Sequence, residues 1–205
     1  MLRLYCAPWS TNVERVALAL GHKGLSVERV WIDYADRSPV IAVSGQPLVP
    51  VLEHDGQVVS DSLRILRYLE RGWPQPPLFP ADPVRAARVA VFLEWFDGVW
   101  KRPPNAIAAE LERGAGADPA AVAIASRRLR GWLAVFEDLL GGGDFLFSAF
   151  GAADCAAYPF LKYAAGRPND DDELFHRVLE RELASDGSHP RLRAWIERVG
   201  AMPRA

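Results

Sequence analysis

The most constraining feature of this chain is a hairpin signal followed directly by a helix start. Val49-Pro50-Val51-Leu52 is an apolar run typical of a β-strand, Asp55-Gly56 favours a tight turn, and Gln57-Val58-Val59 supplies the return strand. Proline has no N–H to give to a sheet, so Pro50 fits the opening of the strand. The N–H and C=O of Val49 are then available to pair with an extended, peptide-like ligand.

The helix start lies immediately behind the hairpin. Ser60-Asp61-Ser62 is a run of N-cap residues, and an apolar pattern at helical spacing follows it. The first turn of a helix presents unpaired N–H groups and a positive dipole end, which together favour a carboxylate. A hairpin and a capped helix with no ligand would give the same pattern, so both interpretations stay open here.

The residues before the hairpin predict a strand, a helix and a second strand. Residues 2–6 form the first strand, a loop over 7–12 is rich in turn and cap residues, the helix begins at Val13, and residues 25–32 form the second strand. A βαβ unit of this kind makes its two strands parallel.

A proline-rich segment then marks the best domain boundary. Residues 73–83 contain prolines at positions 74, 76, 77, 80 and 83, which favour a stiff, extended linker. Everything beyond it is predicted to be helical, with helix starts near Pro83, Pro119, Gly151, the acidic run 170–173 and Pro190. The predicted domains are therefore residues 1–72 and 84–205, joined by 73–83.

Three details of the helical part can be predicted. The first helix carries an apolar stripe, and the second is expected to run unbroken to Leu140. Asp154 stands where a carboxylate reaches back to the N-cap N–H of the helix near Gly151. The stripe of the first helix consists of Val84, Ala87, Val91, Trp95 and Val99.

Composition excludes several function classes. The formal net charge is −2 with no basic block, which argues against nucleic acid as a partner, and no apolar run reaches the ~18 residues of a membrane span. The two cysteines, Cys6 and Cys155, lie far apart and the four histidines are scattered, so no metal site is expected. A reducing, cytoplasmic setting is the default.

Taken in order, these pieces resemble a cytosolic glutathione S-transferase of the serine or cysteine type, as found in bacteria. The matching pieces are residues 4–16, 49–52, 61–62, 150–154, 189–190, 195–198 and 202–203. The resemblance covers nearly the whole chain and implies an α/β thioredoxin-like N-terminal domain that binds glutathione, plus an all-α C-terminal domain.

The resemblance also implies a site. Ser10 matches the residue that activates the thiol, with Thr11 as the reserve candidate and Cys6 as the alternative. The residues implied to bind glutathione are Thr11, Asn12, Val49, Pro50, Asp61 and Ser62. In the family the proline matching Pro50 is cis, and the residues matching Asp61 and Ser62 hold the γ-glutamyl end. The residues implied to line the substrate pocket are Trp9, Trp100 and Lys101.

The implied function is thiol activation. The thiolate of glutathione, the co-substrate, would attack a small hydrophobic electrophile, with no metal involved, and the enzyme would be a homodimer. A lysine or arginine common in the family just before the cis-proline is replaced here by Gln46-Pro47-Leu48, so one contact to the glycine carboxylate is in doubt. Two alternatives remain: a glutathione-dependent disulfide reductase or dehalogenase that uses Cys6, and a non-catalytic interaction protein of this fold.

Overall fold

The structure is a computed structural model that describes residues 1–184 and 187–205. It divides into two units, one of residues 1–82 with 201–205 and one of residues 83–200. These ranges differ from the predicted domains in two respects. The proline-rich segment belongs with the first unit, and so do residues 201–205, which the sequence placed in the helical domain.

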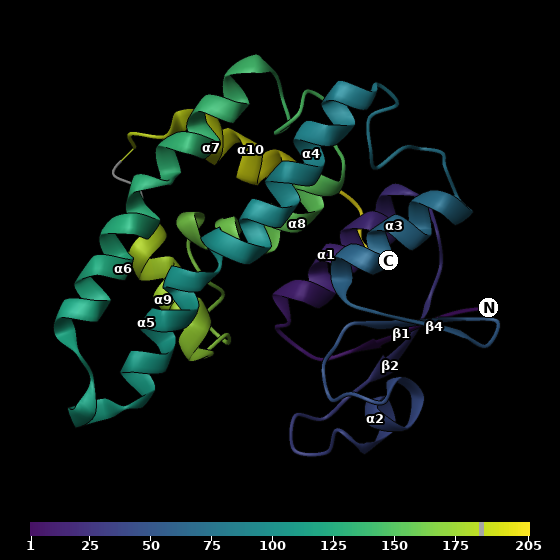
Figure 1. Ribbon diagram of the computed structural model, residues 1–205, viewed down its shortest axis with the longest axis horizontal. Helices are drawn as coiled ribbons and strands as arrows, with labels where there is room; N and C mark the ends of the chain where they lie inside the picture. Colours follow the sequence, from purple (N-terminus) through teal and green to yellow (C-terminus); the bar gives the residue numbers. More distant parts are fainter. Residues whose placement is uncertain (185–186) are drawn as a thin grey trace. The chain divides into compact units, whose positions relative to one another are not determined.

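The first unit is built on a four-stranded sheet of order β2-β1-β3-β4 (Figure 1). Its elements are β1 (Leu2–Cys6), α1 (Thr11–His22), β2 (Glu28–Trp31), α2 (Ser38–Ser44), β3 (Val51–His54), β4 (Gln57–Ser60) and α3 (Ser62–Gly72). Strands β1 and β2 are parallel, and β3 and β4 form the antiparallel hairpin, as predicted. The expected thioredoxin-like fold is confirmed.

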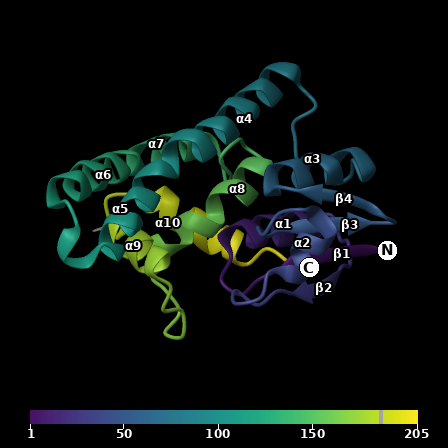
Figure 2. The ribbon, with the colours of Figure 1, turned by 60° about the horizontal axis from the view of Figure 1, so that its bottom comes forward.

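Helices bury both faces of this sheet. Tyr5 and Val51 are register partners between β1 and β3, and they pack with Val40 of α2 on one face. Leu4 and Leu52 are also partners and point to the opposite face, because side chains alternate along a strand. Helices α1 and α3 lie together on that opposite face (Figures 1 and 2).

Three predicted boundaries shift by a few residues. Helix α1 begins at Thr11 rather than Val13 because Ser10 takes the N-cap position. Strand β2 begins at Glu28 rather than residue 25, since the N–H of Leu25 bonds back to Leu20 and closes the helix first. Strand β3 begins at Val51, which leaves Val49 outside the sheet.

A buried lysine fixes the proline-rich segment to the first unit. The ammonium of Lys23 has no exposed surface and lies 2.8 Å from a carboxylate oxygen of Glu70. It also donates to the carbonyls of Trp73 and Pro76, at 2.5 and 2.9 Å. A buried ammonium needs such partners, so the segment packs against α1 and α3 instead of acting as a free linker.

The second unit is helical, as expected. Its elements are α4 (Pro83–Trp95), a π-helical turn (Phe96–Trp100), α5 (Arg102–Glu112), α6 (Pro119–Gly131), α7 (Leu133–Leu139), α8 (Ala152–Leu161), α9 (Leu174–Leu183) and α10 (Pro190–Gly200). Short 3₁₀ turns occur at Gly114–Gly116, Leu140–Gly142 and Lys162–Ala165. The helix predicted to run unbroken to Leu140 is interrupted at Trp132, so it becomes α6 and α7.

The predicted apolar stripe of α4 was wrong. Val84, Val91 and Val99 are 62%, 67% and 41% exposed. The buried face is the neighbouring one, formed by Val89, Phe92, Leu93, Phe96 and Trp100. Both stripes have helical spacing, but the second carries large aromatic side chains, and burying these removes more apolar area from water.

A buried aspartate ties α8 to α10. Asp154 has no exposed surface and accepts hydrogen bonds from the N–H of Gly151 and of Leu146, at 3.0 and 3.1 Å. It also accepts one from Trp195 Nε1 at 2.7 Å. The predicted reach back to the N-cap is confirmed, and burial raises the pKa of this carboxyl to about 6.

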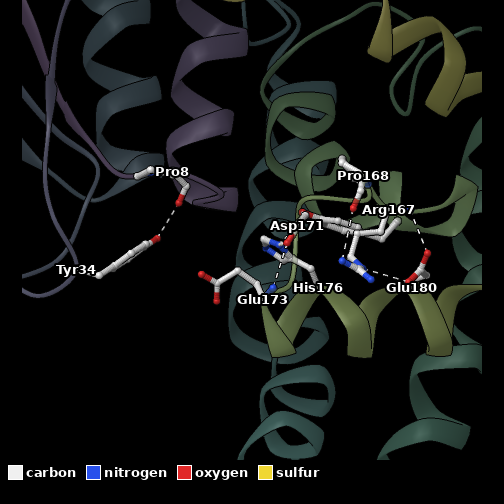
Figure 3. Close-up of polar contacts among 9 residues, drawn as sticks. Pro8, Tyr34, Arg167, Pro168, Asp171, Glu173, His176 and Glu180 are labelled. Atoms are coloured by element: carbon white, nitrogen blue, oxygen red, sulfur yellow. Dashed lines mark hydrogen bonds and ion pairs between the residues drawn. The ribbon is translucent and has the colours of Figure 1, made fainter.

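A second buried carboxylate holds the loop before α9. Asp171 accepts from Tyr163 Oη at 3.2 Å and lies 2.9 Å from His176 Nδ1 (Figure 3). The rings of Tyr163 and His176 stack with their centroids 4.6 Å apart. All three side chains are almost fully buried, and the cluster packs the acidic start of α9 against the preceding turn.

Candidate functional site

Ser10 occupies the turn between β1 and α1. It is half-buried, and its Oγ accepts a hydrogen bond from the N–H of Val13 at 3.3 Å, which makes it the N-cap. A serine hydroxyl has one donor and two acceptor positions, so the cap leaves the O–H proton able to donate to a ligand. Thr11 is only 9% exposed, and Asn12 is half-buried in the first turn of α1.

The residues around Ser10 present an aromatic side chain to the surface. Trp9 has φ 59°, an uncommon value for a residue with a side chain, and it is 40% exposed. The carbonyl of Pro8 accepts a hydrogen bond from Tyr34 Oη at 3.0 Å, and Figure 3 shows the Tyr34 hydroxyl directed at it. The loop is therefore held from the side of β2.

Val49 offers the open backbone position that the sequence predicted. The Val49–Pro50 peptide bond is cis, as the resemblance implied, and Pro50 is buried. Among the residues that the structure describes, no hydrogen bond involves the backbone N–H or C=O of Val49. An extended ligand could pair with both groups as an added strand.

Asp61 and Ser62 stand at the start of α3. Asp61 is exposed, and as N-cap its Oδ1 accepts the N–H of Arg64 at 3.0 Å. Its φ of 77° is rare for a residue with a side chain, and such strained positions cluster at functional sites. Ser62 is only 4% exposed, and its Oγ accepts from Arg15 NH1 at 3.3 Å.

Sequence reasoning missed two arginines, Arg15 and Arg37. Arg15 of α1 is fully buried and contacts Ser62. Arg37, before α2, stacks its guanidinium 4.4 Å from the Tyr34 ring centroid and donates to the carbonyl of Pro47 at 3.3 Å. Pro47 lies in the segment that lacks the family's usual cation. No local pattern signals either contact: Ser62 lies 47 residues from Arg15, and Pro47 lies 10 residues from Arg37, beyond the far end of α2.

Cys6 is placed where a thiol is inert. It has no exposed surface, and its Sγ lies 3.7 Å from the carbonyl oxygen of Val30. Burial raises the pKa of the thiol, so the reactive thiolate is disfavoured. Cys155 of α8 is also a free, buried cysteine.

The two pocket candidates of the helical unit have different environments. Trp100 has no exposed surface, and its ring stacks on Phe96 at 4.5 Å, which differs from the prediction that it lines a substrate pocket. Within the described residues its Nε1 has no hydrogen-bond acceptor. Lys101 keeps 21% of its side chain exposed, 3.5 Å from Asp97.

Over residues 1–184 and 187–205, no three His, Cys, Asp or Glu side chains gather closely enough to hold a metal ion. Over the same ranges no helix has the length and apolar content to cross a bilayer.

Comparison with known proteins assigns this chain to a family. The family model for the glutathione S-transferase N-terminal domain matches residues 4–77, and that for the C-terminal domain matches residues 119–198. The chain belongs to the glutathione S-transferase superfamily.

Individual relatives agree with this assignment. Protein IN2-1 homolog B of Oryza sativa subsp. indica is 30% identical over 164 residues, covering 78% of this chain and 64% of that protein. A glutathione S-transferase from Methylobacterium radiotolerans, solved in complex with glutathione sulfonate, is 29% identical with a TM-score of 0.74 and covers 98% of this chain and 90% of that one. A Tau class glutathione S-transferase from Mangifera indica shares the fold, with a TM-score of 0.80 at 23% identity, over 98% and 89% of the two chains.

Proposed function

We propose that this protein is a glutathione transferase that activates the thiol of glutathione for attack on a small hydrophobic electrophile. The observation that carries the proposal is the open backbone of Val49 beside cis-Pro50, which suits the cysteinyl part of an extended tripeptide. Val49 and Ser10 belong to the same unit of the chain, which supports a single glutathione site there.

Ser10 is proposed to activate the thiol. A free thiol of this kind has a pKa near ~8.5, so only a few per cent is thiolate at pH 7. The hydroxyl of Ser10, whose acceptor side is used by Val13 N–H, would donate to the sulfur and favour the charged form. The thiolate then attacks the electrophile, the new carbon–sulfur bond forms, and the leaving group departs with its electron pair.

The two charged ends of glutathione have matching groups. The exposed carboxylate of Asp61 and the hydroxyl of Ser62 suit the γ-glutamyl ammonium and carboxylate. The segment 46–48 lacks the lysine or arginine that would pair with the glycine carboxylate of glutathione. Arg37 is proposed to replace that cation, because its guanidinium donates to the carbonyl of Pro47 in the same segment. Trp9, exposed beside Ser10, would contact the hydrophobic electrophile.

The assembly and location remain part of the proposal. A homodimer is expected, and the exposed Arg64 and Arg67 of α3 are candidates for its contact surface. Two free, buried cysteines suit a reducing compartment such as the cytoplasm. The burial of Cys6 disfavours the reductase and dehalogenase alternative.

Glutathione is expected to raise the melting temperature of the wild type and to do so far less for Asp61→Ala. At 100 times its Kd a single-site ligand adds about 2.7 kcal/mol to the free energy of unfolding. Without ligand, Asp61→Ala should lose only the cap, about 1 kcal/mol. Differential scanning fluorimetry with and without glutathione measures both effects. A wild type that neither gains stability nor forms a thioether with glutathione would contradict the proposed function.

Cys6→Ala is expected to retain most transferase turnover. The thiol is buried, and desolvation raises its pKa by more than the charge of Arg29 lowers it, so we expect the thiol to serve packing alone and its loss to cost about 1 kcal/mol of stability. Steady-state turnover of glutathione with an aryl halide tests this. Abolished turnover with retained glutathione binding would instead favour the enzyme that uses Cys6 itself.

A further inference from the structure

A charged residue is buried in the helix that begins at Ser10. Arg15 has no exposed surface, and its neighbours on the buried side of α1 are almost all apolar. Removing a guanidinium from water is unfavourable unless hydrogen bonds compensate it. Its NH1 group donates to Ser62 Oγ across 47 residues of sequence. The contact joins the helix of the thiol loop to the start of α3.

This contact determines the hydrogen-bonding role of the Ser62 hydroxyl. A guanidinium has only donors, so Ser62 Oγ must accept from Arg15, and its own proton must be given to another acceptor. Ser62 is also the first residue of α3, where unpaired N–H groups and the dipole favour negative charge. The hydroxyl, the helix start and the buried cation behind them all favour a carboxylate.

Asp61, the residue before Ser62, favours a positively charged group instead. Its carboxylate is exposed, and Oδ1 already caps the N–H of Arg64. A group that accepts an ammonium therefore stands next to one that binds a carboxylate. This pairing suits the α-amino acid end of a ligand, such as the γ-glutamyl group of glutathione.

We propose that Arg15 is a positioning residue, which holds the Ser62 hydroxyl as a donor toward the γ-glutamyl carboxylate and thereby sets the affinity for glutathione. The inference rests on the proposed function. Arg15 is buried and does not itself contact the ligand, but through Ser62 it makes the γ-glutamyl end of the site favour a carboxylate. Arg15 acts on binding alone, since the thiol is activated at Ser10.

The test measures steady-state kinetics with glutathione and an aryl halide. Arg15→Met should raise KM for glutathione about tenfold and leave kcat at saturating glutathione within about twofold, because binding and not thiol activation is lost. Ser62→Ala should do the same. The double variant should also stay near tenfold rather than about a hundredfold, since both changes remove one shared interaction. Arg71→Met, an exposed arginine at the end of α3, is the control and should match the wild type.

The outcomes separate this inference from the proposed function. An unchanged KM, a loss confined to kcat, or effects that multiply in the double variant would each overturn the role of Arg15 alone. If Arg15→Met does not fold, Arg15→Lys keeps the buried charge but replaces the planar donor, and the same rise in KM is required of it. A wild type without glutathione turnover or binding would overturn the proposed function and this inference with it.

Discussion

Ser10→Ala is expected to lower turnover with glutathione near pH 7 by about a hundredfold, the effect typical of removing one donor to a developing anion. Without the hydroxyl the pKa of the bound thiol should rise toward its free value. Part of the lost turnover should therefore return at high pH, where the thiol ionises unaided. Affinity for glutathione should change little, because the proposed contacts to its backbone and charged ends are at Val49, Asp61 and Ser62. The pH–rate profile of wild type and variant gives the result.

The structure makes stability a poor readout for this variant. Ser10 Oγ caps the N–H of Val13, so Ser10→Ala should also lose about 1 kcal/mol whatever its role in catalysis. Ser10→Gly is the matched control, since glycine at an N-cap costs only a few tenths of a kcal/mol. It should lose turnover as Ser10→Ala does while remaining nearly as stable as the wild type. A wild-type pH–rate profile in both variants would transfer the role to Thr11.

Asp154→Ala is expected to lower the free energy of unfolding by about 3 kcal/mol or more. The change leaves three buried donors, the N–H groups of Gly151 and Leu146 and the indole of Trp195, without their acceptor. Each orphaned donor costs about 1–3 kcal/mol, which relief from burying a charge offsets in part. Since domains are stable by only about 5–15 kcal/mol, soluble yield should fall as well. Urea unfolding measures the loss.

The same aspartate gives a pH dependence whose sign can be worked out. Its pKa in the folded protein, about 6, lies above the unfolded value near ~3.9, so folding takes up a proton between these limits. Its contribution to stability is complete below pH ~4 and is lost as pH rises through about 6. The stability difference between wild type and Asp154→Ala should therefore be larger at pH 5 than at pH 8. Asp170→Ala, an exposed acid, is the control, and a loss of similar size there would contradict the assignment.

Features set by neighbouring residues could be predicted from the sequence. The hairpin about Asp55-Gly56, the N-cap of α6 at Asp118 and the reach of Asp154 to Gly151 all depend on groups within a few positions of one another. The candidate site follows the same rule in part. Ser10, Val49 and Asp61 are recognisable because each sits in a turn whose backbone chemistry is local.

Tertiary structure decided the features that depend on distant partners. Two stripes along α4 and the π-helical turn after it have helical spacing, and only packing selected the one with Phe96 and Trp100 over the one with Val91. Whether Cys6 is reactive depended on burial by the whole first unit, since desolvation is what raises its pKa.

The two arginines show the same division at the site. Arg15 and Arg37 are, in the sequence, two of many arginines. The contacts that make them candidates, with Ser62 and with Pro47, exist only in the folded chain. Local hydrogen-bonding chemistry can be read along the chain because it acts over a few residues. The burial of a charge and the direction of a hydroxyl depend on groups far apart in sequence, so only the folded chain determines them.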